Sequence, residues 1–312
     1  MPFDSVKPPI HPQTENLTVE GKKLIIVTIN QGINKPYATS SGDYYIKSSS
    51  DKKKISQEQL RRLFAESRNL YADEDVLLKT NITDINTELF YQFVSKEDAI
   101  IYEDLKNGDL KLETILENYG VIENKNLTLS GNLLFGLLPQ KFSPSFYVDC
   151  VAFIGNDISS TEFLSENRIK GTLKTLYVES LAFIKSHLKR RQSDKDFNSL
   201  GKLEIDEIVL SELIINALIH RDYYINSPIK LFIFDNRVEI ISPGKLTNSL
   251  TIEKIKKGLS IHRNPILNSL AKYVLHYSGR GSGIKRVFSI NPNVELINDT
   301  DKEEFKCIIY RE

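Results

Sequence analysis

Three polar residues recur at every fourth position of the otherwise apolar stretch ELIINALIHRD: Glu212, Asn216 and His220. At 3.6 residues per turn, a spacing of four drifts by only about 40° per step, so the three side chains form one stripe along a helix. Most other positions are Leu, Ile or Ala, which predicts a helix buried on most sides. A structural role remains open, in which Glu212 and Asn216 satisfy backbone groups and His220 lies at a frayed end.

The stripe also suits chemistry on phosphate groups. A carboxylate buried without a partner is costly, so it persists mainly beside a cation, a metal ion or water. The amide oxygen of Asn216 could bind a hard cation such as Mg²⁺. The Glu212 carboxylate, one turn away, could polarise a water molecule for attack on phosphorus.

Closely spaced glycines form the second candidate feature. The stretch SGRGSGIKRV places Gly279, Gly281 and Gly283 just before an apolar periodic segment. Such a turn exposes backbone N–H groups at a helix N-terminus, which favours an anion. It is not a Walker A loop, because Ile284 separates Gly283 from Lys285. A plain turn between two elements also favours glycine, so the motif alone does not decide between the two roles.

The C-terminal part predicts the elements that must position these residues. Asp206 is placed to cap the helix with the polar stripe, which we expect to end near His220. The clearest hairpin turns at Asp235-Asn236. The expected elements are a strand within residues 145–155, a helix over 169–188, a polar loop over 189–199, the hairpin over 228–244 and a last strand over 305–310.

The N-terminal part predicts a hairpin that turns at Glu20-Gly21, a strand over residues 44–47 and a helix capped by Ser56. A helical pattern from residue 86 to 119 indicates two or three short helices that end at Gly120. A small hairpin and a short helix follow within residues 121–136. The chain is therefore expected to be mixed α+β.

The composition is that of an ordinary globular protein. Of 312 residues, 40% are hydrophobic and 26% are charged, and Lys+Arg and Asp+Glu both total 41, so net charge predicts no partner. Two cysteines argue against a disulfide framework and fit a reducing cytosol, so a cytoplasmic location is expected. The sequence contains no signal peptide or long apolar run, so no membrane association is expected.

Two basic runs, at residues 52–54 and 189–191, interrupt the even charge. A solvated loop or helix end explains such runs most simply. Contact with a phosphate backbone is the functional alternative, and it makes Lys52, Lys53 and Lys54 candidate DNA-binding residues.

Four motifs in order resemble a known family: E-x-x-x-N-A-x-x-H-R-D-Y (212–223), DNRVEIISPGKL (235–246), RNPIL (263–267) and GRGSGIKRV (279–287). The series resembles the divergent ATP-binding domain of RecG-like, helicase-related transcriptional regulators. That domain is a branch of the GHKL, or Bergerat-fold, ATPases. Residues 7–64 resemble the second half of a Schlafen-type AlbA domain, a module associated with DNA. An earlier stretch with a FAN…GG signature is missing, so we expect an N-terminally truncated AlbA domain.

The resemblance implies a role for each matching residue. Glu212 would be the general base that orients the attacking water, and Asn216 would hold Mg²⁺ on the phosphates of ATP. Gly279, Gly281 and Gly283 would form the phosphate lid, with His220 at the pocket edge. Ser242 and Gly244 stand where most GHKL enzymes carry D-x-G-x-G, whose Asp accepts a hydrogen bond from adenine. A serine hydroxyl is a weaker and less selective acceptor than that carboxylate.

The resemblance also implies an organisation in three parts. We expect the AlbA-like α/β half-domain over residues 1–70, a helical connecting segment over 71–130, and a Bergerat-type two-layer α/β sandwich over 131–312. ATP and Mg²⁺ are the implied cofactors. DNA is the implied partner, with binding that needs the missing N-terminal part, and a homo-oligomer remains open.

The family match leaves two hypotheses about function open, and a third hypothesis comes from a different class of protein. The first is a DNA-associated transcriptional regulator with a working Mg-dependent ATPase domain, favoured by the spacing of Glu212 and Asn216. The second is a regulatory or DNA-binding protein whose GHKL-like domain is catalytically silent, favoured by the Ser-Pro-Gly sequence at 242–244. A histidine-kinase-like phosphotransferase is disfavoured, because no dimerisation helix presents a phospho-acceptor histidine ahead of the domain.

Overall fold

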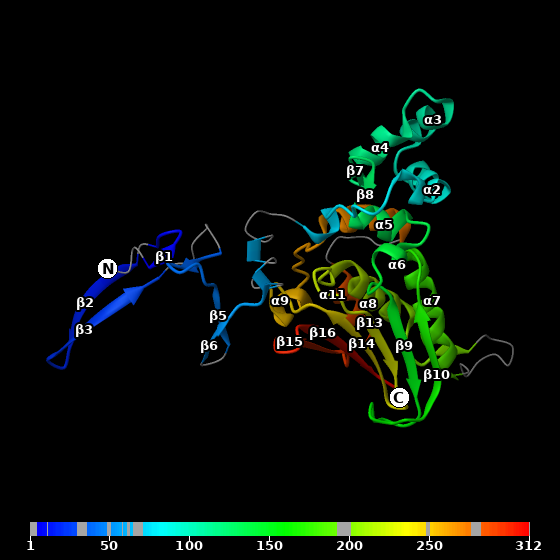
Figure 1. The fold of residues 1–312 in the computed structure, drawn as a ribbon. Coiled ribbons are helices and arrows are strands. Elements are labelled where there is room, and N and C mark those ends of the chain that lie inside the picture. Colours follow the sequence, from blue (N-terminus) through cyan, green and yellow to red (C-terminus); the bar gives the residue numbers. More distant parts are fainter. Residues whose placement is uncertain are drawn as a thin grey trace. The chain divides into compact units, whose positions relative to one another are not determined.

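The structure is a computed structural model that divides into two compact units, Met1–Tyr71 and Ala72–Glu312. The described residues are 5–10, 12–29, 36–48, 51–57, 59–60, 63–64, 71–191, 201–247, 250–275 and 282–311. Figure 1 labels the helices and strands.

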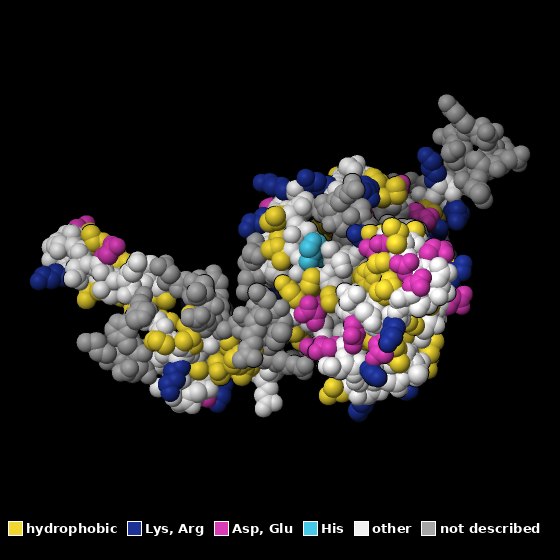
Figure 2. All heavy atoms as spheres, turned by 90° about the horizontal axis from the view of Figure 1, so that it is seen from above, with side chains coloured by type: hydrophobic (Ala, Val, Ile, Leu, Met, Phe, Trp, Pro, Cys, Tyr) yellow, Lys and Arg dark blue, Asp and Glu magenta, His cyan; other side chains and the backbone are white. Residues whose placement is uncertain are grey.

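The first unit consists mainly of short antiparallel strand pairs. β1 (Val6–Lys7) pairs with β4 (Ala38–Thr39), β2 (Gln13–Val19) with β3 (Lys22–Thr28), and β5 (Tyr45–Ser48) with β6 (Asp51–Lys54). The predicted turn between β2 and β3 is confirmed, with Glu20 and Gly21 both at positive φ, a combination typical of hairpin turns. The space-filling view shows hydrophobic side chains at the surface of this unit (Figure 2). Ser56 accepts a hydrogen bond from Gln59 N, as expected of a helix cap.

The second unit begins with the short helices that the sequence predicted. They are α2 (Thr87–Glu97), α3 (Ala99–Asn107) and α4 (Leu112–Asn118), preceded by the 3-10 turns η2 (Ala72–Glu74) and η3 (Ile82–Asp84). The small hairpin and short helix are also confirmed, as β7 (Ile122–Glu123), β8 (Asn126–Leu127) and α5 (Leu129–Phe135), followed by α6 (Pro139–Phe142). The N-caps Asn86 and Asp98 each accept a backbone N–H.

Within the described residues, one six-stranded sheet forms the centre of the second unit, in the order β10-β9-β13-β14-β16-β15. The strands are β9 (Val148–Phe153), β10 (Phe163–Ile169), β13 (Ile229–Ile233), β14 (Arg237–Pro243), β15 (Glu295–Asp299) and β16 (Glu304–Tyr310). β9 and β13 run parallel, and the other neighbours are antiparallel. The predicted hairpin turning at Asp235-Asn236 is confirmed as β13–β14.

The helices that pack on this sheet lie along one side of it (Figure 1). They are α7 (Leu173–His187) and α8 (Glu207–His220). α11 (Gly283–Ile290) packs on α8, and α9 (Ile252–Lys256) and α10 (Pro265–Val274) lie at their margin. Val148, Cys150 and Ala152 of β9 belong to the main core, whereas Phe153 joins a separate small cluster. This alternation is what a sheet with one helix-covered face requires. The predicted α+β class, with a C-terminal two-layer sandwich, is confirmed.

Two strands and one helix boundary differ from the sequence prediction. The helix expected over 169–188 begins at Leu173, and Ile169 instead ends β10. β10 lies at the edge of the sheet and is largely exposed, so it lacks the apolar alternation that marks a strand. β15, the other edge strand, was also missed. The loop expected over 189–199 contains β11 (Arg190–Arg191), which pairs with β12 (Lys202–Leu203); residues 192–200 lie outside the described part.

Candidate functional site

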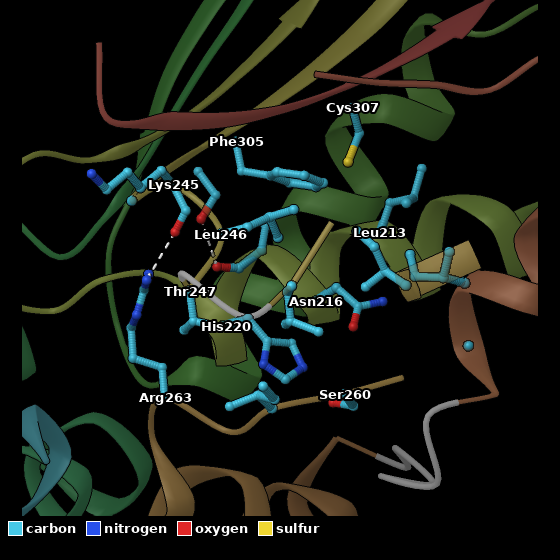
Figure 3. A pocket seen from close by; sticks show the side chains of 18 of the residues that line it. Leu213, Asn216, His220, Lys245, Leu246, Thr247, Ser260, Arg263, Phe305 and Cys307 are labelled. Carbon is cyan, nitrogen blue, oxygen red and sulfur yellow. Dashed lines mark hydrogen bonds between the residues drawn. The ribbon is translucent and has the colours of Figure 1, made fainter. Parts of the chain in front are cut away.

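A cleft between α8, the end of β14, α9 and the start of α11 contains most of the predicted site residues. It encloses about 960 Å³ of non-protein space, its open mouth included. The residues predicted from the sequence that line it are Glu212, Asn216, His220, Ser242, Gly244 and Gly283. Figure 3 shows Asn216 and His220 projecting from α8 into this space. Gly279 and Gly281 lie outside the described residues.

The helix α8 carries the polar stripe along one wall of the cleft. Asp206 caps the helix by accepting from Ile208 N at 2.8 Å. The apolar residues of α8 are buried in the main core, so the helix cannot rotate without exposing them. Asn216 Nδ2 donates to the backbone oxygen of Glu212 at 2.7 Å. The amide oxygen of Asn216 has no hydrogen-bond donor among the described residues, which leaves it available to a ligand.

Glu212 is only 7% exposed and is held by neighbours from two helices. Its Oε2 lies 3.4 Å from Nη1 of Arg286, and its Oε1 lies 3.5 Å from Nδ2 of Asn216. Gly283, the first residue of α11, lies against the same carboxylate: a Cβ there would be 1.6 Å from Oε1. Burial raises the pKa of Glu212, while Arg286 and Asn216 oppose this rise. A carboxylate with a raised pKa is suited to accepting a proton from water.

The end of β14 brings Ser242 and Gly244 to the opposite wall. The Ser242 hydroxyl donates to the backbone oxygen of Ala217 at 3.1 Å. Gly244 has a φ of 105°, and a Cβ there would lie 2.5 Å from Cβ of Asp222. Both its conformation and its surroundings therefore require glycine.

The RNPIL motif fixes the end of α8. Asn264 Nδ2 donates to the backbone oxygens of Ile219 and Arg221, at 2.8 and 2.9 Å. These carbonyls would otherwise lack partners at the helix C-terminus. Arg263 donates to the backbone oxygen of Lys245 at 2.8 Å and so ties this segment to the residues after β14 (Figure 3).

His220 lies at the cleft and stacks on His262, with ring centroids 6.0 Å apart and an interplanar angle of 18°. Burial lowers the pKa of His220 to about 4, assisted by the nearby charges of His262 and Arg263. His220 is therefore neutral at pH 7 and offers no positive charge to a phosphate.

Several residues of the site were missed by the sequence analysis. Arg286 stands one helical turn after Gly283 in the motif already recognised, and that spacing could have revealed it. Phe305 and Cys307 alternate along β16 and both face the cleft (Figure 3). Burial raises the pKa of the Cys307 thiol to about 12. The apolar lining comprises Leu213, Ala217, Ile240, Leu246, Leu250, Ile255, Leu259, Ile261, Ile284 and Phe305.

The polar groups of the cleft are of the kinds that bind a nucleotide and a magnesium ion. The described residues contain no cluster of three His, Cys, Asp or Glu side chains that could hold a metal ion by itself. Mg²⁺ in nucleotide sites needs few protein ligands, because phosphates and water complete its coordination. The unpaired amide oxygen of Asn216 is of the required type. The missing side chain at Gly283 lets α11 begin directly against the Glu212 carboxylate, where a Cβ would overlap Oε1.

The three candidate DNA-binding lysines lie on β6 of the first unit and do not share one face. Strand register places Lys52 opposite Lys47 and Lys54 opposite Tyr45, whereas Lys53 is opposite Ile46. Directly opposed residues project to the same side, so Lys53 points away from the other two. Lys52 lies over the Tyr45 ring, 3.7 Å from its centroid, and Lys54 forms a 2.6 Å ion pair with Asp43.

Two family models match the chain. Residues 226–298 match the model described as "Putative ATP-dependent DNA helicase recG C-terminal", and residues 2–56 match "Schlafen, AlbA_2". The first match includes Ser242, Gly244 and the glycines before α11. It begins after α8, so Glu212 and Asn216 lie outside it.

A solved structure supports the fold along the whole chain. The DIP2311 protein from Corynebacterium diphtheriae is 16% identical, with a TM-score of 0.56, and the alignment covers 99% of this chain. The chain spans 61% of the length of that protein. No curated protein matches the sequence. Among the described residues, no helix is long and apolar enough to cross a membrane.

The chain combines an AlbA_2-type region with a RecG C-terminal-like, ATPase-type region, which is the architecture that the resemblance predicted.

Proposed function

We propose that the chain is a DNA-associated transcriptional regulator, helicase-related in its C-terminal domain, that binds Mg-ATP in the cleft beside α8. The observation that carries this proposal is the convergence of Glu212, Asn216 and Gly283 in a cleft whose lining is largely apolar. Nucleotides have charged phosphates at one end and a flat base at the other. Nucleotide binding would change the geometry of the lid or of a dimer.

The phosphates belong at the end of the cleft where α11 begins. The backbone N–H groups of a helix N-terminus attract anions, and α11 begins at Gly283, which lines the cleft. The Asn216 amide oxygen would hold Mg²⁺, which neutralises phosphate charge when bound. Glu212 would orient a water molecule and take its proton at a carboxylate oxygen.

The base belongs near Ser242, where Ile240 of β14 and Phe305 of β16 also line the cleft. Because the Ser242 hydroxyl already donates its one proton to the Ala217 carbonyl, its oxygen can only accept a further hydrogen bond. An exocyclic amino group, as in adenine, satisfies that acceptor. Guanine also carries an amino group, so the serine alone does not select ATP over GTP.

Mg-ATP at about one hundred times its Kd should stabilise the chain by about 2.7 kcal/mol and raise its melting temperature. Asn216→Ala should abolish most of this shift, because it removes the oxygen that would hold the metal. Asn226→Ala, an exposed amide in the loop after α8, is the matched control and should keep the shift. Thermal unfolding with ATP, ADP and GTP provides the measurement, and no shift of the unaltered chain at millimolar Mg-ATP would reject the proposal.

A catalytically silent domain is the alternative, and Ser242-Pro243-Gly244 in place of the acidic adenine acceptor favours it. Once nucleotide binding is established, an assay of phosphate release distinguishes the working ATPase from the silent domain. Phosphate release that disappears in Glu212→Gln would establish turnover by this site. Binding of Mg-ATP without phosphate release would favour the silent alternative.

For DNA, the geometry favours the face of the β5–β6 hairpin that carries Lys47, Lys52 and Tyr45. A double Lys47→Gln/Lys52→Gln variant should bind duplex DNA more weakly and reduce the slope of log K against log salt by about 2. Lys53→Gln removes the same charge from the opposite face and should leave the slope unchanged. Fluorescence anisotropy over a salt series measures both effects, and an equal loss in the Lys53 variant would contradict the assignment.

A further inference from the structure

We propose that Ser165 is a nucleophile, with His187 as its general base, in a second site that hydrolyses carboxylic esters. Ser165 lies on β10 at the edge of the sheet, and His187 is the last residue of α7. Neither residue lines the cleft beside α8, so this activity goes beyond the proposed function and does not depend on nucleotide binding.

The hydrogen bond between the two side chains has the direction that activates a serine. Ser165 Oγ lies 2.7 Å from Nε2 of His187. Nδ1 of the same ring lies 2.8 Å from the backbone oxygen of Phe183, which can only accept a hydrogen bond. Nδ1 therefore carries the proton of the neutral ring, and Nε2 has the free electron pair that accepts from the Ser165 hydroxyl.

The His187 ring is held in this orientation by its own helix. Ser186 Oγ lies 3.1 Å from Nδ1, and the ring of Phe183 packs on the imidazole with centroids 4.6 Å apart. A nucleophile, a base within hydrogen-bond distance and a third group that orients the base form the arrangement that activates serine in nucleophilic catalysis. Here the third group is a backbone carbonyl in place of a carboxylate.

The surroundings of Ser165 leave it accessible to an ester and favour an apolar acyl group. Ser165 is half-buried, and its neighbours on β10, Phe163 and Leu164, are 49% and 67% exposed. The register of β10 on β9 shifts between Phe163 and Ser165, and such bulges re-aim side chains and are common next to active sites. Within the described residues β10 pairs only with β9, so N–H groups along its outer edge can donate to the oxygen of a bound carbonyl.

The reaction proceeds through an acyl-serine. The Ser165 oxygen attacks the carbonyl carbon of the ester while its proton moves to Nε2 of His187. The bond to the alcohol oxygen then breaks, and the alcohol leaves with that proton. Water attacks the acyl carbon and gives a proton to Nε2. The bond to the serine oxygen breaks, the carboxylic acid is released, and the proton returns to Ser165.

A fluorophosphonate probe tests the nucleophile directly, because the serine oxygen bonds to phosphorus and fluoride leaves. Mass spectrometry of the intact chain and of its peptides should show an adduct on Ser165. Ser165→Ala should remove the adduct, and His187→Ala should slow its formation by about 100-fold, with partial recovery when imidazole is added. Ser95→Ala, at an exposed serine of α2 whose hydroxyl also makes a local hydrogen bond, is the matched control and should be labelled as the unaltered chain is.

Hydrolysis of p-nitrophenyl butyrate is the second measurement and should follow the same order of variants. If the hydrogen bond only ties β10 to α7, Ser165→Ala would lower the urea midpoint and the unaltered chain would stay unlabelled. An adduct that persists in Ser165→Ala, or equal labelling rates in His187→Ala and the unaltered chain, would also overturn the inference. Labelling of the unaltered chain decides the matter even where a variant fails to fold.

Discussion

Gly283→Ala is expected to destabilise the second unit by about 2–3 kcal/mol and to weaken nucleotide binding. The new methyl carbon would lie 1.6 Å from Oε1, 2.3 Å from Cδ and 2.9 Å from Cγ of Glu212. These atoms belong to a buried side chain that packs between α8 and α11, so it cannot simply swing into solvent. At an open helical position, the same substitution would instead stabilise the fold by about 0.5–1 kcal/mol.

A double-mutant cycle isolates this contact. All three of the nearest atoms belong to the Glu212 side chain, so Glu212→Ala removes the overlap. The Gly283→Ala/Glu212→Ala variant should therefore be considerably more stable than the sum of the two single changes predicts. Urea unfolding of the four proteins measures the coupling. If the two effects simply add, α11 does not rest on Glu212 as described.

The polar stripe on α8 was predictable because helical periodicity and burial are local properties. The spacing of Glu212, Asn216 and His220 placed them on one face, and the structure puts that face at the cleft. Their assigned roles remain predictions. The counterion of Glu212 was not predictable in this way, since Arg286 is 74 residues away and reaches it only through the packing of α11 on α8.

The start of α10 shows a second limit of local reasoning. By sequence rules Asn264, just before Pro265, would cap this helix with its own side chain. Instead, the side-chain amide of Asn264 donates to two backbone carbonyls at the end of α8. Its side chain makes no capping hydrogen bond to α10. Asp73 takes its place, with Oδ2 accepting from Leu267 N at 2.9 Å. Nothing in either segment reveals that residues 194 positions apart share this task.

Asp73 ought to make the stability of the second unit depend on pH in an unusual direction. It is fully buried, and its Oδ1 has no hydrogen-bond partner among the described residues. Burial raises its pKa from the ordinary 3.8 to about 6, although the Leu267 N–H opposes the rise. Between these two values the folded chain binds more protons than the unfolded chain. Its contribution to stability is therefore greatest below pH 3.8 and declines as pH rises to about 6.

Asp73→Asn removes this dependence while keeping an oxygen that accepts from Leu267. Relative to the unaltered chain, we expect the variant to gain up to about 3 kcal/mol of stability between pH 4 and pH 7.5. Urea midpoints at the two pH values provide the comparison. The exposed neighbour Glu74, changed to Gln, is the control and should show little change. A constant difference between Asp73→Asn and the unaltered chain would mean that Asp73 titrates normally. The cap on α10 would then be made without the cost of burying a charge.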